Sequence, residues 1–168
     1  MKNELLELKA HVKRLDAMRM RVFSLGAVHI ETVRQVDTYF NSPKGRLKLR
    51  EDNSNEKAKL IYYLREDKAE AKRSETILID VQEPEAFKAL FENLLGKRGI
   101  VDKEREIYMF EGTQIHLDTV KNLGTFIEFE RKITNTSNDR LVIEDLMKRL
   151  QIEKEDLIHG SYSDLLKL

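Results

Sequence analysis

The chain contains no cysteine and no tryptophan, and it has only two prolines. The absence of cysteine excludes disulfides, thiolate metal sites and cysteine nucleophiles. Its 30 basic and 30 acidic residues cancel, so no net charge draws the molecule toward nucleic acid or an anionic membrane. Any attraction for an anion must therefore come from a local cluster of cations.

Long apolar runs are also absent, since no stretch approaches the roughly 20 residues that span a bilayer. The first residues, Met1 to Glu4, lead directly into an alternating pattern and lack the apolar segment of a secretory signal. We therefore expect no membrane partner and a cytoplasmic location. The 168 residues match the length of one domain, and we expect a single domain over residues 1–168.

Apolar and polar residues alternate in eight segments, which is typical of β-strands with one apolar and one polar face. The expected strands are residues 5–12, 28–41, 46–50, 58–65, 74–81, 101–110, 114–120 and 125–133. Short turns join most of them, and the charged connection from Glu66 to Lys72 is expected to be a solvated turn.

Apolar residues at helical spacing predict helices over residues 15–25 and 84–95, each followed by a glycine where a C-cap is expected. The tail from Asn138 onward has the same spacing, and it is followed by a second short segment that ends with residues 163–166. This content indicates an α+β fold in which helices pack on one side of an antiparallel sheet. The alternation does not decide whether the sheet closes into a barrel.

The run Arg46-Leu47-Lys48-Leu49-Arg50 places three cations on one strand face and two leucines on the other. Neighbours on one face lie roughly 7 Å apart, a spacing that suits consecutive phosphates of a polyphosphate. Taken alone, the run favours a solvated outer face, since charged outer faces are ordinary. Further cations end the next strand at Arg65 and share a later face at Lys103 and Arg105.

Two carboxylates, Glu128 and Glu130, share one face of the last strand. Mg²⁺ and Mn²⁺ prefer a few carboxylate oxygens, so the pair is a candidate cation site, with Glu7 and Asp118 placed to complete it. Cross-strand pairing with lysine or arginine is an equally good reading of the pair alone.

Other sequence signals for chemistry are weak. The His116-Leu117-Asp118 run is more typical of surface polarity than of a metal or proton-transfer site, so His116 is assigned no catalytic role. The remaining histidines share no ligand spacing, which argues against zinc, and no glycine-rich phosphate loop occurs. Phosphate binding would therefore depend on side chains, and no catalytic residue is assigned.

Taken together, these segments resemble the CYTH superfamily, or triphosphate tunnel metalloenzymes, and within it the class IV adenylate cyclase-like branch. The resemblance runs nearly end to end. Its motifs are Glu7-Leu8-Lys9 in the place of an N-terminal ExExK motif, Gln35 to Phe40, Arg46 to Glu51, Tyr63 to Arg65, Lys103 to Arg105, His116 to Asp118, Leu123 to Glu130 and Gly160 to Leu166.

The resemblance implies a closed antiparallel eight-stranded β-barrel whose polar faces turn inward to form a triphosphate tunnel, with helices packed outside. It also implies a homodimer as a common state. The implied triphosphate-binding residues are Lys9, Arg46, Lys48, Arg50, Arg65, Lys103 and Arg105. The implied ligands of Mg²⁺ or Mn²⁺ are Glu7, Glu128 and Glu130, which Asp118 either joins or supports by orienting a cation.

One position departs from the family pattern. The first glutamate of ExExK falls at Leu5, because Glu4 is out of register and would point to the opposite face. The departure puts the second metal position in question.

The resemblance leaves three functions open. A class IV adenylate cyclase would convert ATP to 3′,5′-cyclic AMP and pyrophosphate, and a triphosphatase would hydrolyse inorganic, thiamine or nucleoside triphosphate. A non-catalytic module would only bind a polyphosphate or nucleotide. In each case the partner is a small-molecule triphosphate. Nucleic acid is disfavoured, because aromatic residues are few and acids share the cationic faces.

Overall fold

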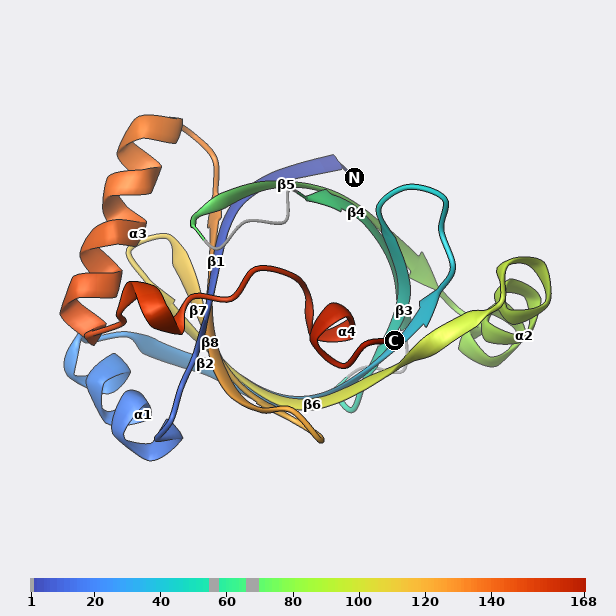
Figure 1. Ribbon diagram of the computed structural model, residues 1–168, viewed down its shortest axis with the longest axis horizontal. Coiled ribbons are helices and arrows are strands. Elements are labelled where there is room, and N and C mark those ends of the chain that lie inside the picture. Colours follow the sequence, from blue (N-terminus) through green and yellow to red (C-terminus); the bar gives the residue numbers. More distant parts are fainter. Residues whose placement is uncertain (1, 55–57, 66–69) are drawn as a thin grey trace.

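The computed structural model describes residues 2–54, 58–65 and 70–168. Within these residues, eight strands form a closed barrel in the order β1-β5-β4-β3-β2-β6-β7-β8, and every neighbouring pair is antiparallel (Figure 1). The closed antiparallel barrel implied by the resemblance is therefore confirmed. The strands are β1 (Lys2–His11), β2 (Val28–Phe40), β3 (Arg46–Asp52), β4 (Ala58–Arg65), β5 (Lys72–Val81), β6 (Lys97–Phe110), β7 (Thr113–Val120) and β8 (Gly124–Lys132).

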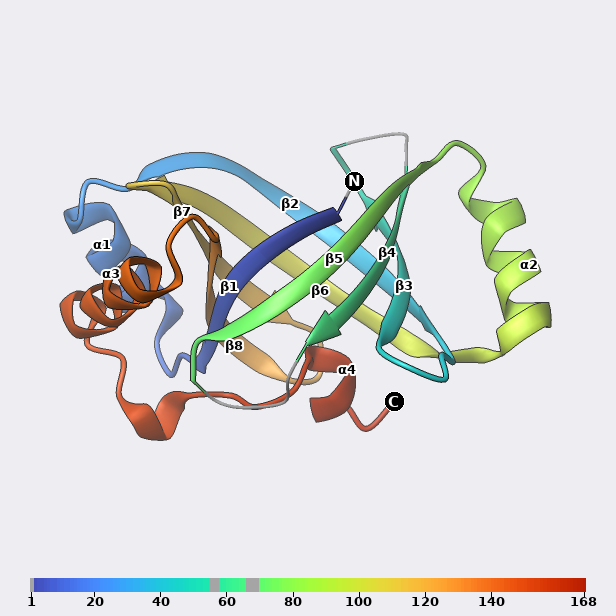
Figure 2. The same cartoon turned by 90° about the horizontal axis from the view of Figure 1, so that it is seen from above.

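The helices are α1 (Leu15–Ser24), α2 (Pro84–Leu95), α3 (Thr136–Leu150) and α4 (Tyr162–Leu165). Helices α1 and α3 lie together on one side of the barrel, and α2 lies on the opposite side (Figures 1 and 2). The short α4 differs from the expected helices outside the wall, because it lies across one end of the barrel (Figure 2). No helix in the described ranges is long and apolar enough to cross a membrane.

Three strands begin more than one residue earlier than expected, and the first of them is β1, which begins at Lys2 instead of residue 5. Strand β6 begins at Lys97, directly after the glycine that ends α2, instead of near residue 101. Strand β5 begins at Lys72, whose side chain is fully buried, so the expected solvated turn does not extend to this lysine. Residues 66–69 of that expected turn lie outside the described residues.

The apolar faces of β1, β7 and β8 point out of the barrel toward α1 and α3. In β1, Leu6 and Leu8 belong to a buried cluster with Val22 of α1 and Ile143 of α3. The alternate residues of β1 face the barrel interior, where Leu5, Glu7 and Lys9 line a cavity. The main core thus lies between the barrel wall and its helices, and this leaves the interior to polar side chains.

The start of α3 depends on one buried carboxylate, Asp139 in its first turn. Its oxygens accept hydrogen bonds of 2.8 Å from the backbone N–H groups of Thr134 and Asn135 and from Nε of Arg131. Burial raises the pKa of Asp139, but these donors outweigh burial and lower it to about 2. The carboxylate therefore stays charged and fixes the turn between β8 and α3.

Replacing Asp139 with asparagine is expected to lower the melting temperature by roughly 5–10 °C at pH 7, because Arg131 loses its buried partner. The stabilisation belongs to the charged form with the lowered pKa. It is therefore present above about pH 4 and lost as the pH falls through about 2. Thermal melts between pH 7 and pH 2.5 should show the two proteins converging on acidification. Asp145→Asn, at an exposed site of the same helix, is the control and should change little.

Candidate functional site

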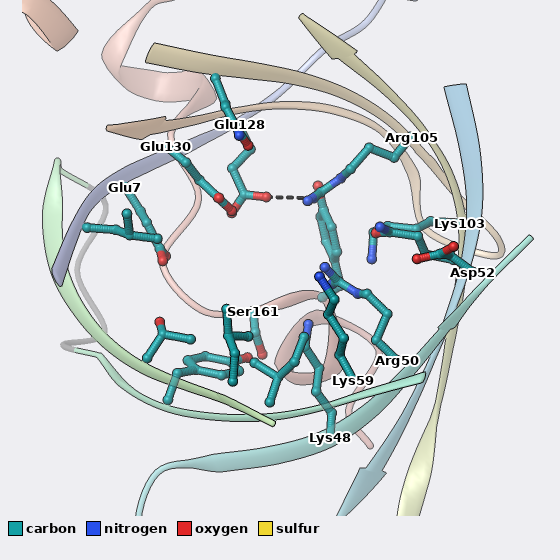
Figure 3. Close-up of a pocket in the computed structure, with 18 of the residues that line it drawn as sticks. Glu7, Lys48, Arg50, Asp52, Lys59, Lys103, Arg105, Glu128, Glu130 and Ser161 are labelled. Carbon is teal, nitrogen blue, oxygen red and sulfur yellow. Dashed lines mark hydrogen bonds and ion pairs between the residues drawn. The ribbon is translucent and has the colours of Figure 1, made fainter. Parts of the chain in front are cut away.

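The barrel interior contains a cavity of about 410 Å³ that is lined from all eight strands and by Ser161 and Tyr162 at the α4 end. Three glutamates gather on one side of it, whereas most of the cations, with Asp52 among them, gather on the other. Figure 3 shows Glu7, Glu128 and Glu130 on one side and Lys48, Arg50, Lys59 and Lys103 on the other. We call these two groups the acidic wall and the cationic wall.

The cationic wall is built around one carboxylate, Asp37 of β2. Nζ of Lys48 and of Lys103 lie 2.8 and 3.1 Å from its Oδ2, and Arg50 donates two hydrogen bonds to it at 2.7 and 2.8 Å. The register explains the convergence, because Asp37 is opposite Arg50 in β3 and two residues from Gln35, which is opposite Lys103 in β6. Three cationic side chains thus share a single buried negative charge.

The pKa shifts follow from this imbalance. Burial raises the pKa of Asp37, but Arg50, Lys103 and Lys48 outweigh burial and hold it well below its usual value. Burial and the nearby Arg50 lower the pKa of Lys103 well below its usual value, against the pull of Asp37. The cationic wall therefore carries an excess of positive charge, and an added anion would stabilise its charged state.

Cations also contact the acidic wall. Glu128 accepts a 2.7 Å hydrogen bond from Arg105, and Nζ of Lys9 lies 3.2 Å from its other oxygen. Burial raises the pKa of Glu128, but the neighbouring cations Lys9 and Arg105 hold it well below its usual value. Glu7 and Glu130 are directly opposite each other in the pairing of β1 with β8, so three carboxylates lie along adjacent strands.

Asp118 occupies a different position from the other expected metal ligands. It is fully buried and accepts two hydrogen bonds from Arg105, at 2.7 and 2.6 Å, and one from the Tyr162 hydroxyl at 2.6 Å. Burial raises its pKa, but Arg105 outweighs burial and lowers it to about 2. It is not among the residues that line the cavity. The structure thus places Asp118 behind Arg105, where it orients that cation.

Two expected triphosphate ligands are not brought to the cavity lining. Arg46 donates a 2.7 Å hydrogen bond to Asp164 of α4 and does not line the cavity, although Lys48 and Arg50 of the same run do. The side chain of Arg65 lies outside what the structure describes. The remaining expected cations, Lys9, Lys103 and Arg105, all line the cavity.

Several site residues were missed in the sequence. Asp37 and Gln35 alternate within the Gln35 to Phe40 run and could have been assigned to one face with Tyr39. Lys59 of β4 lines the cavity beside Arg50, its partner in the strand pairing. His116 was expected to be surface polarity, and this was wrong, because it is 2% exposed and faces the acidic wall.

The acidic wall fits a divalent cation. One ligand atom each from His116, Glu128 and Glu130 lies within 4.8 Å of the others, a spacing that a single ion can bridge. Nδ1 of His116 is buried and has no hydrogen-bond partner among the described residues. Carboxylate oxygens supply the hard ligands that Mg²⁺ and Mn²⁺ take.

An antiparallel barrel that turns its charged faces inward and its apolar faces toward outer helices defines a tunnel protein. The model of the CYTH domain family matches residues 4–162, and the chain belongs to this family. The match confirms the resemblance seen in the sequence motifs.

Individual relatives agree with this assignment. The chain is 28% identical, over 95% of its length and 97% of the other chain, to a protein of Methanocaldococcus jannaschii named "putative adenylate cyclase". The solved structure of the PH1012 protein from Pyrococcus horikoshii is 28% identical and superposes with a TM-score of 0.89, over 96% of this chain and 98% of that one.

The same fold occurs in a more distant protein from Hippeastrum, described as a "putative adenylyl cyclase" with a dominant triphosphatase activity. That structure is 15% identical and has a TM-score of 0.71, over 98% of this chain and 95% of that one. At this identity the likeness concerns the fold alone.

Proposed function

We propose that the chain is a divalent-metal-dependent enzyme that binds ATP by its triphosphate in the tunnel and converts it to 3′,5′-cyclic AMP and pyrophosphate. The observation that carries the triphosphate part is the cationic wall, where Lys48, Arg50 and Lys103 share the single carboxylate of Asp37. Buried charges that exceed their counter-charges are costly unless a ligand compensates them. A polyphosphate supplies several negative charges along one line, and these would pair with the cations of the wall.

The two walls would act on different parts of the same ligand. Lys48, Arg50 and Lys103 would hold phosphate oxygens directly, and Lys59 lines the same side. Glu7, Glu128 and Glu130 would hold Mg²⁺ or Mn²⁺, which supplies charge neutralisation to the phosphates when bound. Phosphoryl chemistry depends mainly on such positioning and electrostatic stabilisation, so the tunnel needs no nucleophilic side chain of its own.

Two features favour the cyclase reaction. Ile61 and Leu78 are opposite each other in the pairing of β4 with β5, and both line the cavity, where they offer an apolar surface for a nucleoside. The M. jannaschii relative, which aligns with 95% of this chain, is named a "putative adenylate cyclase".

Hydrolysis of a triphosphate is the second candidate. Only four aliphatic residues, Leu5, Ile61, Leu78 and Ile107, are among the described residues that line the cavity. The tunnel therefore offers many more contacts to phosphates than to a base, as expected of an enzyme that accepts inorganic or thiamine triphosphate.

A single incubation series tests the proposal. ATP, thiamine triphosphate and inorganic triphosphate are each incubated with Mg²⁺ or Mn²⁺, and cyclic AMP, pyrophosphate and orthophosphate are measured separately. Cyclic AMP with equimolar pyrophosphate is the expected result from ATP. Release of orthophosphate without cyclic AMP would show that the enzyme is a triphosphatase and not a cyclase. Saturable binding of all three without product would contradict both reactions.

A further inference from the structure

The inner faces of β7 and β8 bring a histidine against the acidic wall. Nδ1 of His116 lies 3.8 Å from Oε2 of Glu128 and 3.8 Å from Oε1 of Glu130. The register accounts for this, because His116 is opposite Glu128 and Gln114 is opposite Glu130. One nitrogen and two carboxylates therefore face a common point.

The hydrogen bonding of the imidazole leaves its Nδ1 lone pair directed at the carboxylates. Nε2 lies 3.1 Å from the side-chain oxygen of Gln114, and because that oxygen can only accept, Nε2 carries the proton. In the neutral ring Nδ1 is then an acceptor, and it has no donor among the described residues. A buried acceptor without a donor is costly, and two facing carboxylates make its surroundings still less favourable.

An ion pair between a protonated His116 and the carboxylates is the competing explanation. Such a pair would place Nδ1–H within hydrogen-bonding distance of an oxygen, whereas both separations are 3.8 Å. Oε2 of Glu128 instead accepts its short bond from Arg105, at 2.7 Å. A cation between the three groups satisfies all of them at once, because ligand atoms around one ion are themselves about 3–4 Å apart when each bond is near 2.1 Å.

We propose that His116 is a direct metal ligand, together with Glu128 and Glu130, and that this mixed nitrogen and oxygen site prefers a divalent transition-metal ion such as Mn²⁺ to Mg²⁺. Imidazole is a common ligand of transition metals, whereas Mg²⁺ keeps to oxygen ligands and water. The inference deepens the proposed function by naming the class of cation that the enzyme uses.

Electron paramagnetic resonance of bound Mn²⁺ tests the proposal without substrate or turnover. Pulsed measurements on the intact protein should show coupling to one directly bound ¹⁴N nucleus. Labelling the protein with ¹⁵N-histidine should replace that coupling by a ¹⁵N coupling, which requires no mutation and hence no assumption about folding.

Substitutions then identify which histidine supplies the nitrogen that is coupled to Mn²⁺. His116→Gln should abolish the coupling and weaken Mn²⁺ binding about tenfold or more, while Mg²⁺ binding changes less than about twofold. His11→Gln, at an exposed histidine of β1, should leave both unchanged. In the wild-type protein, Mn²⁺ should bind at least about tenfold more tightly than Mg²⁺.

Bound Mn²⁺ with no histidine coupling would overturn the proposal, and so would a failure to bind Mn²⁺. These outcomes are separate from those of the product assay. If the coupling is seen but no cyclic AMP is made, His116 is a metal ligand and the proposed cyclase reaction is wrong. If cyclic AMP is made but the coupling is not seen, the cyclase reaction is supported and His116 is not a metal ligand.

Discussion

Replacing Asp37 with alanine is expected to lower the free energy of unfolding by about 3–5 kcal/mol, because it leaves the buried Lys48 and Lys103 and the partly buried Arg50 without their counter-charge. Asp37 is 1% exposed and is the shared partner of Lys48, Arg50 and Lys103. No other carboxylate among the described residues takes part in these three ion pairs. The loss should appear as a lower denaturant midpoint in urea unfolding.

The same variant should respond more strongly to a polyanion. Inorganic triphosphate without metal should raise the melting temperature of Asp37→Ala more than that of the wild type, because the competing carboxylate is gone and the cations remain. Asp102→Ala on the neighbouring β6 is the matched control, since its pair with the largely exposed Arg34 should contribute no more than about 1 kcal/mol. Equal stability of the two variants, or an equal response to triphosphate, would contradict the charge balance assigned to the cationic wall.

The faces of the strands could be predicted from the sequence, but not the direction in which they point. Leu6 and Leu8 of β1 alternate with Leu5, Glu7 and Lys9, and the structure keeps these two sets on opposite faces. Alternation has the same form whether the polar face meets solvent or a tunnel. The direction depends on closure of the sheet and on α1 and α3, which cover the apolar face from distant parts of the chain. Only the family resemblance indicated it.

Local pattern also explains which site residues were found. Lys48 and Arg50 follow from the alternation of one strand, and both reach the cavity. Arg46 follows the same alternation, but it pairs with Asp164, 118 residues away, which no local pattern reveals. Asp37 and His116 each lie on a strand in which polar and apolar residues alternate, and this pattern is as typical of a solvated surface as of a buried site. Their burial is a property of the closed barrel and could not be read from their own segments.

Glu130→Gln is expected to reduce any turnover about 100-fold or more, since the change removes a charged ligand of the metal that neutralises the phosphates. Glu130 suits this test better than Glu128. Its side chain is 26% exposed, whereas Glu128 is bonded to Lys9 and Arg105 and would disturb both if it were changed. Steady-state rates at saturating Mn²⁺ and Mg²⁺, measured for each product separately, provide the readout.

The fold should survive this substitution, because glutamine keeps the shape of the side chain and the site is partly solvated. Unfolding free energies of Glu130→Gln and the wild type should agree within about 0.5 kcal/mol. Binding of inorganic triphosphate in the absence of metal should be equal or tighter in the variant, since one repelling carboxylate is neutralised. Glu104→Gln, on the exposed face of β6, removes a charge outside the tunnel and should leave turnover unchanged. Full turnover by Glu130→Gln would show that the acidic wall is not the metal site, while the cationic wall, tested through Asp37, would stand independently.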